Sequence, residues 1–192
     1  MTLTRAQVVD LLDRHGVRPS RALGQNFVAD PNTVRRIARL AGVGPGDRVV
    51  EIGPGLGALT LALADTGAQI TAIEADRHLM PVLQEVLADR PAVRLVHADA
   101  TKVDWEELLG VGSAAVLVAN LPYNIATPLV ADLLDGTPAL DRMLVMVQRE
   151  VGERWCAGPG DDAYGAVSVK VAYWAEARLA GRVPASVFVP RP

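Results

Sequence analysis

The sequence is poor in cysteine: Cys156 stands alone among 192 residues, so no internal disulfide can form. A chain with no disulfide framework suits a reducing compartment. Its first residues, MTLTR, lack the apolar stretch and the small-residue cleavage site of a secretory signal. Apolar runs are short, and the run at residues 114–119 is far below the ~20 residues that a membrane-spanning helix needs. We therefore expect a cytoplasmic protein with no membrane partner.

Histidine is also scarce, which limits metal chemistry. His15, His78 and His97 lie far apart, and no cluster of cysteine and histidine has the spacing of metal ligands. Cys156 has no accompanying histidine motif and reads as a small core residue rather than a nucleophile. We expect no metal site.

Positive charge is low overall, with a formal net charge of −3, but it is unevenly distributed. Residues 1–39 contain seven arginines and three acidic residues, whereas the remainder of the chain is net acidic. A basic N-terminal arm on an acidic body could be an edge that faces RNA, or simply a solvated helical face. The charge pattern alone leaves these two readings equal.

Two helices are predicted before residue 43. Thr4 and Gln7 form a capping-box pattern for a helix that ends near Gly16, and Asp30-Pro31 is typical of the start of a second helix, to about residue 41. Residues 17–29 show no clear period and are predicted as a loop. We expect residues 1–42 to form a helical cap with a gating loop, and residues 43–192 to form the main domain.

Beyond residue 43, short apolar segments alternate with helical patterns, as in a parallel sheet covered on both faces. The expected class is therefore α/β, Rossmann-like and doubly wound. Strands are predicted at residues 49–52, 70–73, 93–96, 114–119 and 143–147, with a late edge strand at 177–183. Helices are predicted at residues 58–64, 77–88, 104–109, 128–134, 149–155 and 164–174.

A glycine-rich turn follows the first predicted strand. Gly53, Gly55 and Ala58 have the spacing of a dinucleotide-binding loop, and Glu74 closes the next strand, where a carboxylate can bind ribose hydroxyls. This pattern fits a nicotinamide-dependent oxidoreductase as well as a methyltransferase. Glu51, two residues before the loop, would repel a pyrophosphate but favour the cationic tail of S-adenosylmethionine, unless it bonds the loop amides instead.

The fourth predicted strand ends in Asn120, Leu121, Pro122 and Tyr123, at the edge of the sheet where ligands bind. The Asn120 side-chain oxygen and the Leu121 carbonyl can accept the two hydrogens of an exocyclic amine, which localises its lone pair. Pro122 restricts the Leu121 backbone, and Tyr123 offers a face on which an extruded base can stack. A strand-terminating turn is the structural alternative.

Several motifs together resemble the KsgA-type ribosomal RNA adenine dimethyltransferases and the related macrolide-resistance methyltransferases. They are NLPYNIATPL at residues 120–129, LGQNF at 23–27, EIGPGLG at 51–57 and MVQRE at 146–150. The resemblance covers the chain from about residue 18. It implies a seven-stranded methyltransferase sheet, S-adenosylmethionine as the methyl donor, ribosomal RNA as the partner and a monomeric protein.

The resemblance also implies roles for individual residues. Donor contacts fall on the N-terminal loop, the glycine turn and the strand ends: Gln25, Asn26, Val28, Glu51, Gly53, Gly55, Glu74, Asp99 and Asn120. Glu74 would bind the ribose and Asp99 the donor adenine, although each could instead cap a local turn. Phe188 would be a second aromatic at the target base, in addition to the residues 120–123.

Three departures from the family pattern are visible. Val28 replaces a usual leucine, and His97-Ala98 precedes Asp99 where a glycine is frequent. The chain ends at Pro192, where the family continues with a small helical domain, so we expect weakened RNA binding rather than weakened donor binding. The favoured function is dimethylation of adjacent small-subunit adenines during ribosome biogenesis. A large-subunit methyltransferase that confers macrolide resistance and a non-catalytic RNA-binding or transcription-associated module remain alternatives.

Overall fold

The computed structural model describes residues 2–20, 22–110, 114–137 and 139–192. Two helices precede the main sheet along the chain, as predicted: α1 (Arg5–Arg14) and α2 (Pro31–Ala41). Thr4 and Gln7 make the capping box, and the Asp30 carboxylate accepts a hydrogen bond from the Thr33 N–H, so polar side chains satisfy the first free amides of both helices. α2 ends at Gly42, whose positive φ of 60° lets the chain turn away.

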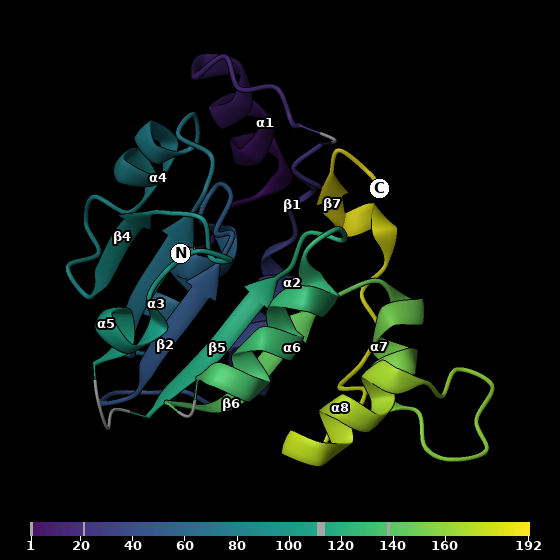
Figure 1. The fold of residues 1–192 in the computed structure, drawn as a ribbon. Helices are drawn as coiled ribbons and strands as arrows, with labels where there is room; N and C mark the ends of the chain where they lie inside the picture. The colour runs from purple at the N-terminus through teal and green to yellow at the C-terminus, as the bar shows by residue number, and fades with distance from the viewer. Residues whose placement is uncertain (1, 21, 111–113, 138) are drawn as a thin grey trace.

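A five-stranded parallel sheet forms the centre of the chain (Figure 1). Its strands are β2 (Arg48–Ile52), β3 (Gln69–Glu74), β4 (Val93–His97), β5 (Ala115–Asn120) and β6 (Leu140–Met146). The spatial order is β4-β3-β2-β5-β6, so the chain moves outward from β2 to β4 and then returns to the other side of β2. That reversal leaves a crevice at the carboxyl ends of β2 and β5, the usual ligand site in such sheets.

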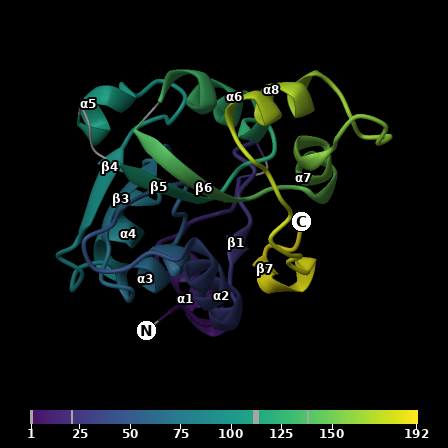
Figure 2. The ribbon, with the colours of Figure 1, turned by 90° about the horizontal axis from the view of Figure 1, so that it is seen from below.

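Helices cover both faces of the sheet because alternate strand residues point to opposite sides. Val49 and Val116 join one apolar cluster with α1, α2, α3 (Ala58–Ala64) and α4 (Met80–Val86), whereas Val50 and Leu117 join a second cluster. The second cluster includes side chains of α5 (Trp105–Leu109), α6 (Ala126–Gly136), α7 (Arg149–Cys156) and α8 (Ala166–Trp174). Figure 2 shows α1–α3 on one side of the sheet and α5, α6 and α8 on the other. The predicted α/β, Rossmann-like class is confirmed.

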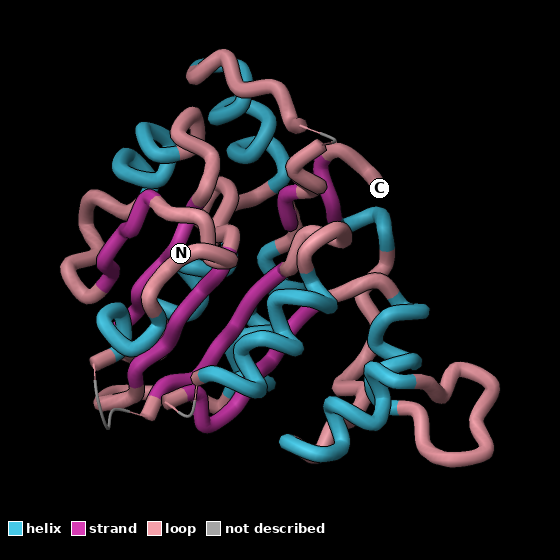
Figure 3. The backbone as a smooth tube through the Cα atoms, in the orientation of Figure 1, coloured by secondary structure: helices cyan, strands magenta, loops and turns pink. Residues whose placement is uncertain are grey.

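The strand count differs from the single seven-stranded sheet that was expected. β1 (Phe27–Val28) and β7 (Phe188–Val189) form a separate antiparallel pair, with Phe27 opposite Val189 and Val28 opposite Phe188. The prediction that residues 17–29 are all loop was therefore wrong at Phe27 and Val28. Figure 3 shows this pair apart from the main sheet.

The late edge strand predicted at residues 177–183 was wrong. This segment is irregular and mostly exposed, and it is followed by a short 3-10 helix, η1 (Ala185–Val187). A strand requires a neighbour for its backbone N–H and C=O groups, and an apolar pattern alone does not supply one. The bounds of two helices also differ from the prediction: α4 is shorter than the predicted 77–88, and α6 begins two residues before the predicted 128.

Arginines of the N-terminal arm have a structural use that the charge pattern did not reveal. The Arg5 guanidinium donates to the carbonyls of Ser186 and Phe188, and the Arg36 guanidinium donates to the carbonyl of Arg182 at 3.1 Å. These bonds fasten the C-terminal segment to α1 and α2. Within the described parts of the chain, no helix has the length and apolar character required to cross a membrane.

Candidate active site

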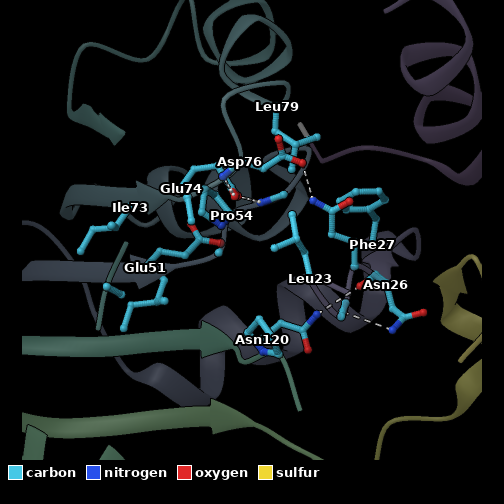
Figure 4. A pocket seen from close by; sticks show the side chains of 18 of the residues that line it. Leu23, Asn26, Phe27, Glu51, Pro54, Ile73, Glu74, Asp76, Leu79 and Asn120 are labelled. Atoms are coloured by element: carbon cyan, nitrogen blue, oxygen red, sulfur yellow. Dashed lines mark hydrogen bonds between the residues drawn. The ribbon is translucent and has the colours of Figure 1, made fainter. Parts of the chain in front are cut away.

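A cavity of about 230 Å³ opens at the carboxyl ends of β2, β3 and β5 (Figure 4). Its lining comes from the loop before α2, the glycine turn, the ends of three strands and the segment after β5. All nine residues predicted to contact the donor line this cavity: Gln25, Asn26, Val28, Glu51, Gly53, Gly55, Glu74, Asp99 and Asn120. Glu51, Glu74 and Asn120 meet in one place because parallel strands present their carboxyl ends at one edge. The N-terminal loop reaches the same edge through hydrogen bonds of Gln25 and Asn26.

The glycine turn needs glycine at Gly55 for two independent reasons. Its φ of +61° lies in the left-handed region that side chains disfavour. A Cβ placed there would also lie 2.8 Å from Cδ1 of Phe27, which covers the turn. The absence of a side chain at Gly55 therefore lets Phe27 pack directly on the turn, and both residues line the cavity.

Glu74 lies at the end of β3 with only 6% of its surface exposed. Its two carboxylate oxygens accept hydrogen bonds from the Gly55 N–H at 3.1 Å and from the Asp76 N–H at 2.9 Å. Burial raises the pKa of Glu74, and the two backbone donors oppose that rise. Glu74 thus ties the glycine turn to the end of β3, and carboxylate lone pairs remain available for a ligand.

Glu51 is the most deeply buried acid of the site, with 1% of its surface exposed. Its Oε2 atom has no hydrogen-bond partner within the described ranges, so the loop amides do not satisfy that oxygen. Burial, reinforced by the charge of Glu74 and opposed by the Thr60 hydroxyl, raises the pKa of Glu51 to about 8. A cationic ligand group beside Glu51 would favour its ionised form.

Asp99 is held by a local turn, as the structural alternative anticipated, but it still lines the cavity. Its Oδ1 accepts hydrogen bonds from the hydroxyl of Thr101 at 2.7 Å and from the N–H of Thr101 at 3.0 Å. The Lys102 ammonium lies 3.3 Å from Oδ2. These donors, led by the Thr101 hydroxyl, hold the pKa of Asp99 below its usual value, so the side chain is an oriented carboxylate.

The side-chain amide of Asn120 has a defined orientation. Its Nδ2 donates a hydrogen bond to the backbone carbonyl of Asn26 at 3.2 Å (Figure 4). Only the nitrogen end of an amide can donate to a carbonyl, so this contact leaves Oδ1 as a free acceptor. An oxygen that is free to accept is what the predicted role of Asn120 requires, and that role stays a prediction.

The other residues of the predicted catalytic set do not all reach the cavity. Pro122 lines it, but Leu121, Tyr123 and Phe188 are not among its described lining residues. The Leu121 side chain is 1% exposed and packs in the second apolar cluster, whereas Tyr123 is 41% exposed. Phe188 is buried within β7, where it pairs with Val28. Stacking of Tyr123 on a base stays a prediction, and the ring of Phe188 is part of the core.

Asp76 is a cavity residue that the sequence reasoning missed. Its Oδ2 accepts a hydrogen bond from Gln25 Nε2 at 2.7 Å, and this contact joins the end of β3 to the N-terminal loop. The signal available in the sequence was its position two residues after Glu74. Phe27 belonged to a recognised motif, but its packing over Gly55 was not foreseen.

Comparison with curated proteins identifies close relatives along the whole chain. Over 195 residues it is 51% identical to the ribosomal RNA small subunit methyltransferase A of Thermobifida fusca, covering 99% of the chain and 67% of that protein. Over 183 residues it is 47% identical to the protein of the same name from Magnetococcus marinus, covering 95% of the chain and 66% of that protein. The chain spans about two thirds of the length of these relatives.

Solved structures agree with this placement. The 23S rRNA methyltransferase ErmE superposes with a TM-score of 0.74 at 28% identity, over 87% of the chain and 65% of that protein. A dimethyladenosine transferase from Plasmodium falciparum superposes with a TM-score of 0.76 at 26% identity, over 86% of the chain and 59% of that protein. Residues 17–192 match the family described as ribosomal RNA adenine dimethylase, and the chain therefore belongs to that family.

Proposed function

We propose that the chain binds S-adenosylmethionine in the cavity and methylates the N6 amino group of adenine in ribosomal RNA. The observation that carries this proposal is the orientation of Asn120, whose oxygen is left free at the cavity by the bond from its nitrogen to Asn26. A free acceptor at this position suits a substrate that carries N–H groups. Family membership supports the same chemistry.

The residues of the cavity fit this donor. Glu51 supplies a buried, unpartnered oxygen for the donor's amino group, and the Gly53 backbone would lie along its methionine part. Glu74 would accept hydrogen bonds from the ribose hydroxyls, and Asp99 from the adenine amino group. When bound, S-adenosylmethionine supplies an electrophilic methyl group on a sulfonium. A pyrophosphate would instead meet two buried carboxylates, which disfavours the nicotinamide alternative.

The chain's own contribution to the reaction is alignment and charge stabilisation. The target amine has its lone pair delocalised into the ring, and hydrogen bonds to Asn120 Oδ1 and the Leu121 carbonyl would draw the lone pair back onto nitrogen. Pro122 restricts the backbone of Leu121 and so sets the direction of its carbonyl. The two acceptors become stronger partners as positive charge develops on the amine.

The preferred RNA follows from the relatives. Those that are 47–51% identical carry the name ribosomal RNA small subunit methyltransferase A, whereas the 23S rRNA methyltransferase ErmE is 28% identical. We therefore infer a small-subunit target, with dimethylation of adjacent adenines. We also propose that the protein acts as a monomer in the cytoplasm. Incubation with unmethylated small ribosomal subunits and labelled donor, followed by mapping of the modified bases, tests this inference. Modification confined to large-subunit RNA would favour the macrolide-resistance alternative. No modification under conditions in which both the donor and the RNA are bound would favour the non-catalytic one.

Replacing Glu74 with alanine is expected to weaken S-adenosylmethionine binding by roughly 1–3 kcal/mol, the usual effect of losing a charge-assisted hydrogen bond. Calorimetry measures this directly, with Glu176→Ala as the control because Glu176 is exposed and remote from the cavity lining. Glu74→Gln keeps the shape of the side chain and separates loss of charge from disruption of the glycine turn. Unchanged donor affinity in both Glu74 variants, or binding of NAD in preference, contradicts the assignment.

Donor binding is expected to slow hydrogen exchange in the N-terminal loop. Residues 22–26 lie against the cavity through a few polar contacts, so their opening is cheaper than that of the sheet. A donor beneath them adds contacts that exist only when the loop is closed. Exchange measured with and without S-adenosylmethionine checks this, with β5 as the internal reference, and equal protection in both states contradicts a gating role.

Tyr123 is expected to act through its ring face. Tyr123→Phe should retain activity, while Tyr123→Ala should lose about 1–3 kcal/mol of base stacking. Among the described residues no hydrogen bond to the Tyr123 hydroxyl is found, and the residue is 41% exposed, so Tyr123→Phe should not lower the unfolding temperature. Tyr123→Ala also removes the buried part of the ring, so its unfolding temperature is measured beside its rate. Methylation rates of the two variants decide the point: if both are equally slow, the hydroxyl is required and the stacking account is wrong.

A further inference from the structure

A strap of residues 22–26 joins the two strand ends that bear the proposed site. On one side, the side-chain nitrogen Nε2 of Gln25 donates to Asp76 Oδ2 at 2.7 Å. On the other side, the carbonyl of Asn26 accepts from Asn120 Nδ2 at 3.2 Å. Figure 4 draws the bond that reaches Asp76 and the bond between Asn120 and Asn26 as dashed lines. The position of the Asn26 carbonyl, and with it the orientation of Asn120, depends on how the strap is held.

Gln25 makes hydrogen bonds through the oxygen and the nitrogen of its side-chain amide and through its backbone N–H. Its Oε1 accepts from the Ser20 N–H at 2.8 Å, and its own N–H donates to the Ser20 carbonyl at 3.0 Å. The oxygen end is therefore committed to Ser20, which leaves the nitrogen end to bond Asp76. Gln25 is thus bonded both to Ser20 and to Asp76, and it directly precedes Asn26, so loss of the bond to Asp76 is expected to displace the Asn26 carbonyl.

Asp76 is itself a fixed anchor. Its backbone N–H donates to Glu74 Oε1 at 2.9 Å, and its Oδ1 accepts from the His78 N–H at 2.9 Å. Only Oδ2 faces Gln25. The carboxylate is thus oriented by its own strand end, and its bond to Gln25 transmits that position to the strap.

Close packing supports the strap at one further point. A Cβ added to Gly24, whose φ is +62°, would lie 3.2 Å from Cβ of Pro122. The strap therefore sits directly on the segment that follows Asn120. Apolar contact of this kind limits how closely the strap can approach Pro122, but it does not prevent the strap from moving away from the cavity. The polar bond to Asp76 opposes lifting.

We propose that Asp76 is a positioning residue for methyl transfer, acting through Gln25 and the Asn26 carbonyl to orient the amide of Asn120. This inference rests on the proposed function, because it takes Asn120 as the acceptor for the target amine. Without the Asn26 carbonyl, the amide can turn over and present its N–H groups to the amine. Two donors facing each other repel, so the turned amide is unproductive.

The test separates rate from affinity. At saturating donor, Asp76→Ala should lower the methylation kcat by about tenfold or more. The donor Kd should rise by a smaller factor, through loss of the closed strap, because the backbone N–H that holds Glu74 is retained. Asp76→Asn should recover only part of the rate, because its single amide oxygen can accept from Gln25 only when its NH2 group faces the His78 N–H. Asp162→Ala, at an exposed position outside the cavity lining, serves as the control. Hydrogen exchange of the strap should accelerate in Asp76→Ala alone.

A double substitution tests the route. In an Asn120→Ala background nothing remains to be oriented, so adding Asp76→Ala should slow the residual rate by less than about twofold. An equal slowing in both backgrounds overturns the inference, as does an Asp76→Ala variant that methylates at the unsubstituted rate. If the unsubstituted chain itself is inactive, that result contradicts the proposed function and not the role of Asp76. Hydrogen exchange of the strap in Asp76→Ala then shows whether Asp76 holds the strap in place.

Discussion

Replacing Asn120 with alanine is expected to slow methyl transfer by about a hundredfold or more, with little change in donor affinity. The reason is that the free Oδ1 of Asn120 acts on the target amine most strongly as positive charge develops there. Its amide is already oriented by the bond from Nδ2 to the Asn26 carbonyl, so no reorganisation is needed during the reaction. Removal of a pre-oriented acceptor therefore affects the transition state more than the bound ground state.

Single-turnover rates with saturating donor, together with calorimetry for S-adenosylmethionine, check the Asn120 prediction. Asn120→Asp is the informative second variant, because it retains an acceptor oxygen but places a carboxylate against the Asn26 carbonyl, and we expect it to be slow as well. Asn32→Ala is the control, since Asn32 is exposed on α2 and lies outside the cavity lining. A normal rate in Asn120→Ala would mean that residues 120–123 form only a turn. That result would favour the alternative of a non-catalytic RNA-binding module.

Replacing Glu51 with glutamine is expected to stabilise the ligand-free protein while it weakens donor binding. Burial raises the pKa of Glu51 from 4.5 to about 8 in the folded chain, so the folded state holds this proton more tightly than the unfolded state does. Below pH 4.5 both states are protonated and the group costs no stability. Between 4.5 and about 8 the penalty grows by about 1.4 kcal/mol per pH unit, and above about 8 it is constant.

The glutamine variant has no such penalty, so its advantage should rise with pH to on the order of 3–5 kcal/mol above pH 8. Urea unfolding of both proteins at pH 5, 7 and 9 measures the difference. Donor affinity of the unsubstituted chain should increase with pH over the same window, because the ionised carboxylate is the form that attracts a cation. A stability difference that does not vary with pH would contradict the buried, proton-binding state of Glu51.

Local patterns predicted the secondary structure well where the deciding interactions are local. Thr4, Gln7 and Asp30 cap helices with side chains that reach only three residues along the chain, and these caps are present as predicted. The alternation of short apolar runs with helices also implied parallel strands, and the common carboxyl edge of such strands brought Glu51, Glu74 and Asn120 together. No contact between distant residues had to be known for these predictions.

Predictions that needed a distant partner were wrong or absent. β1 pairs with β7, which is about 160 residues away along the chain, and no periodicity in a two-residue strand reveals such a partner. Residues 177–183 have a strand-like pattern but no neighbour to complete their backbone hydrogen bonds. The predicted aromatic role of Phe188 stays a prediction, and its burial opposite Val28 favours a structural role. The division of the chain at residue 42 also stays a prediction.

By itself the sequence determined the fold class, the edge of the sheet that bears the site and the residue types available there, because each depends on short-range spacing and on the geometry common to parallel sheets. Only the tertiary structure decided which way the Asn120 amide faces, that Asp76 anchors Gln25, and that Arg5 and Arg36 bind backbone carbonyls of the C-terminal segment. These contacts join residues 51 to 183 positions apart. A hydrogen bond depends on the final distance and direction of two groups, and for such distant groups the packing of the whole chain sets both.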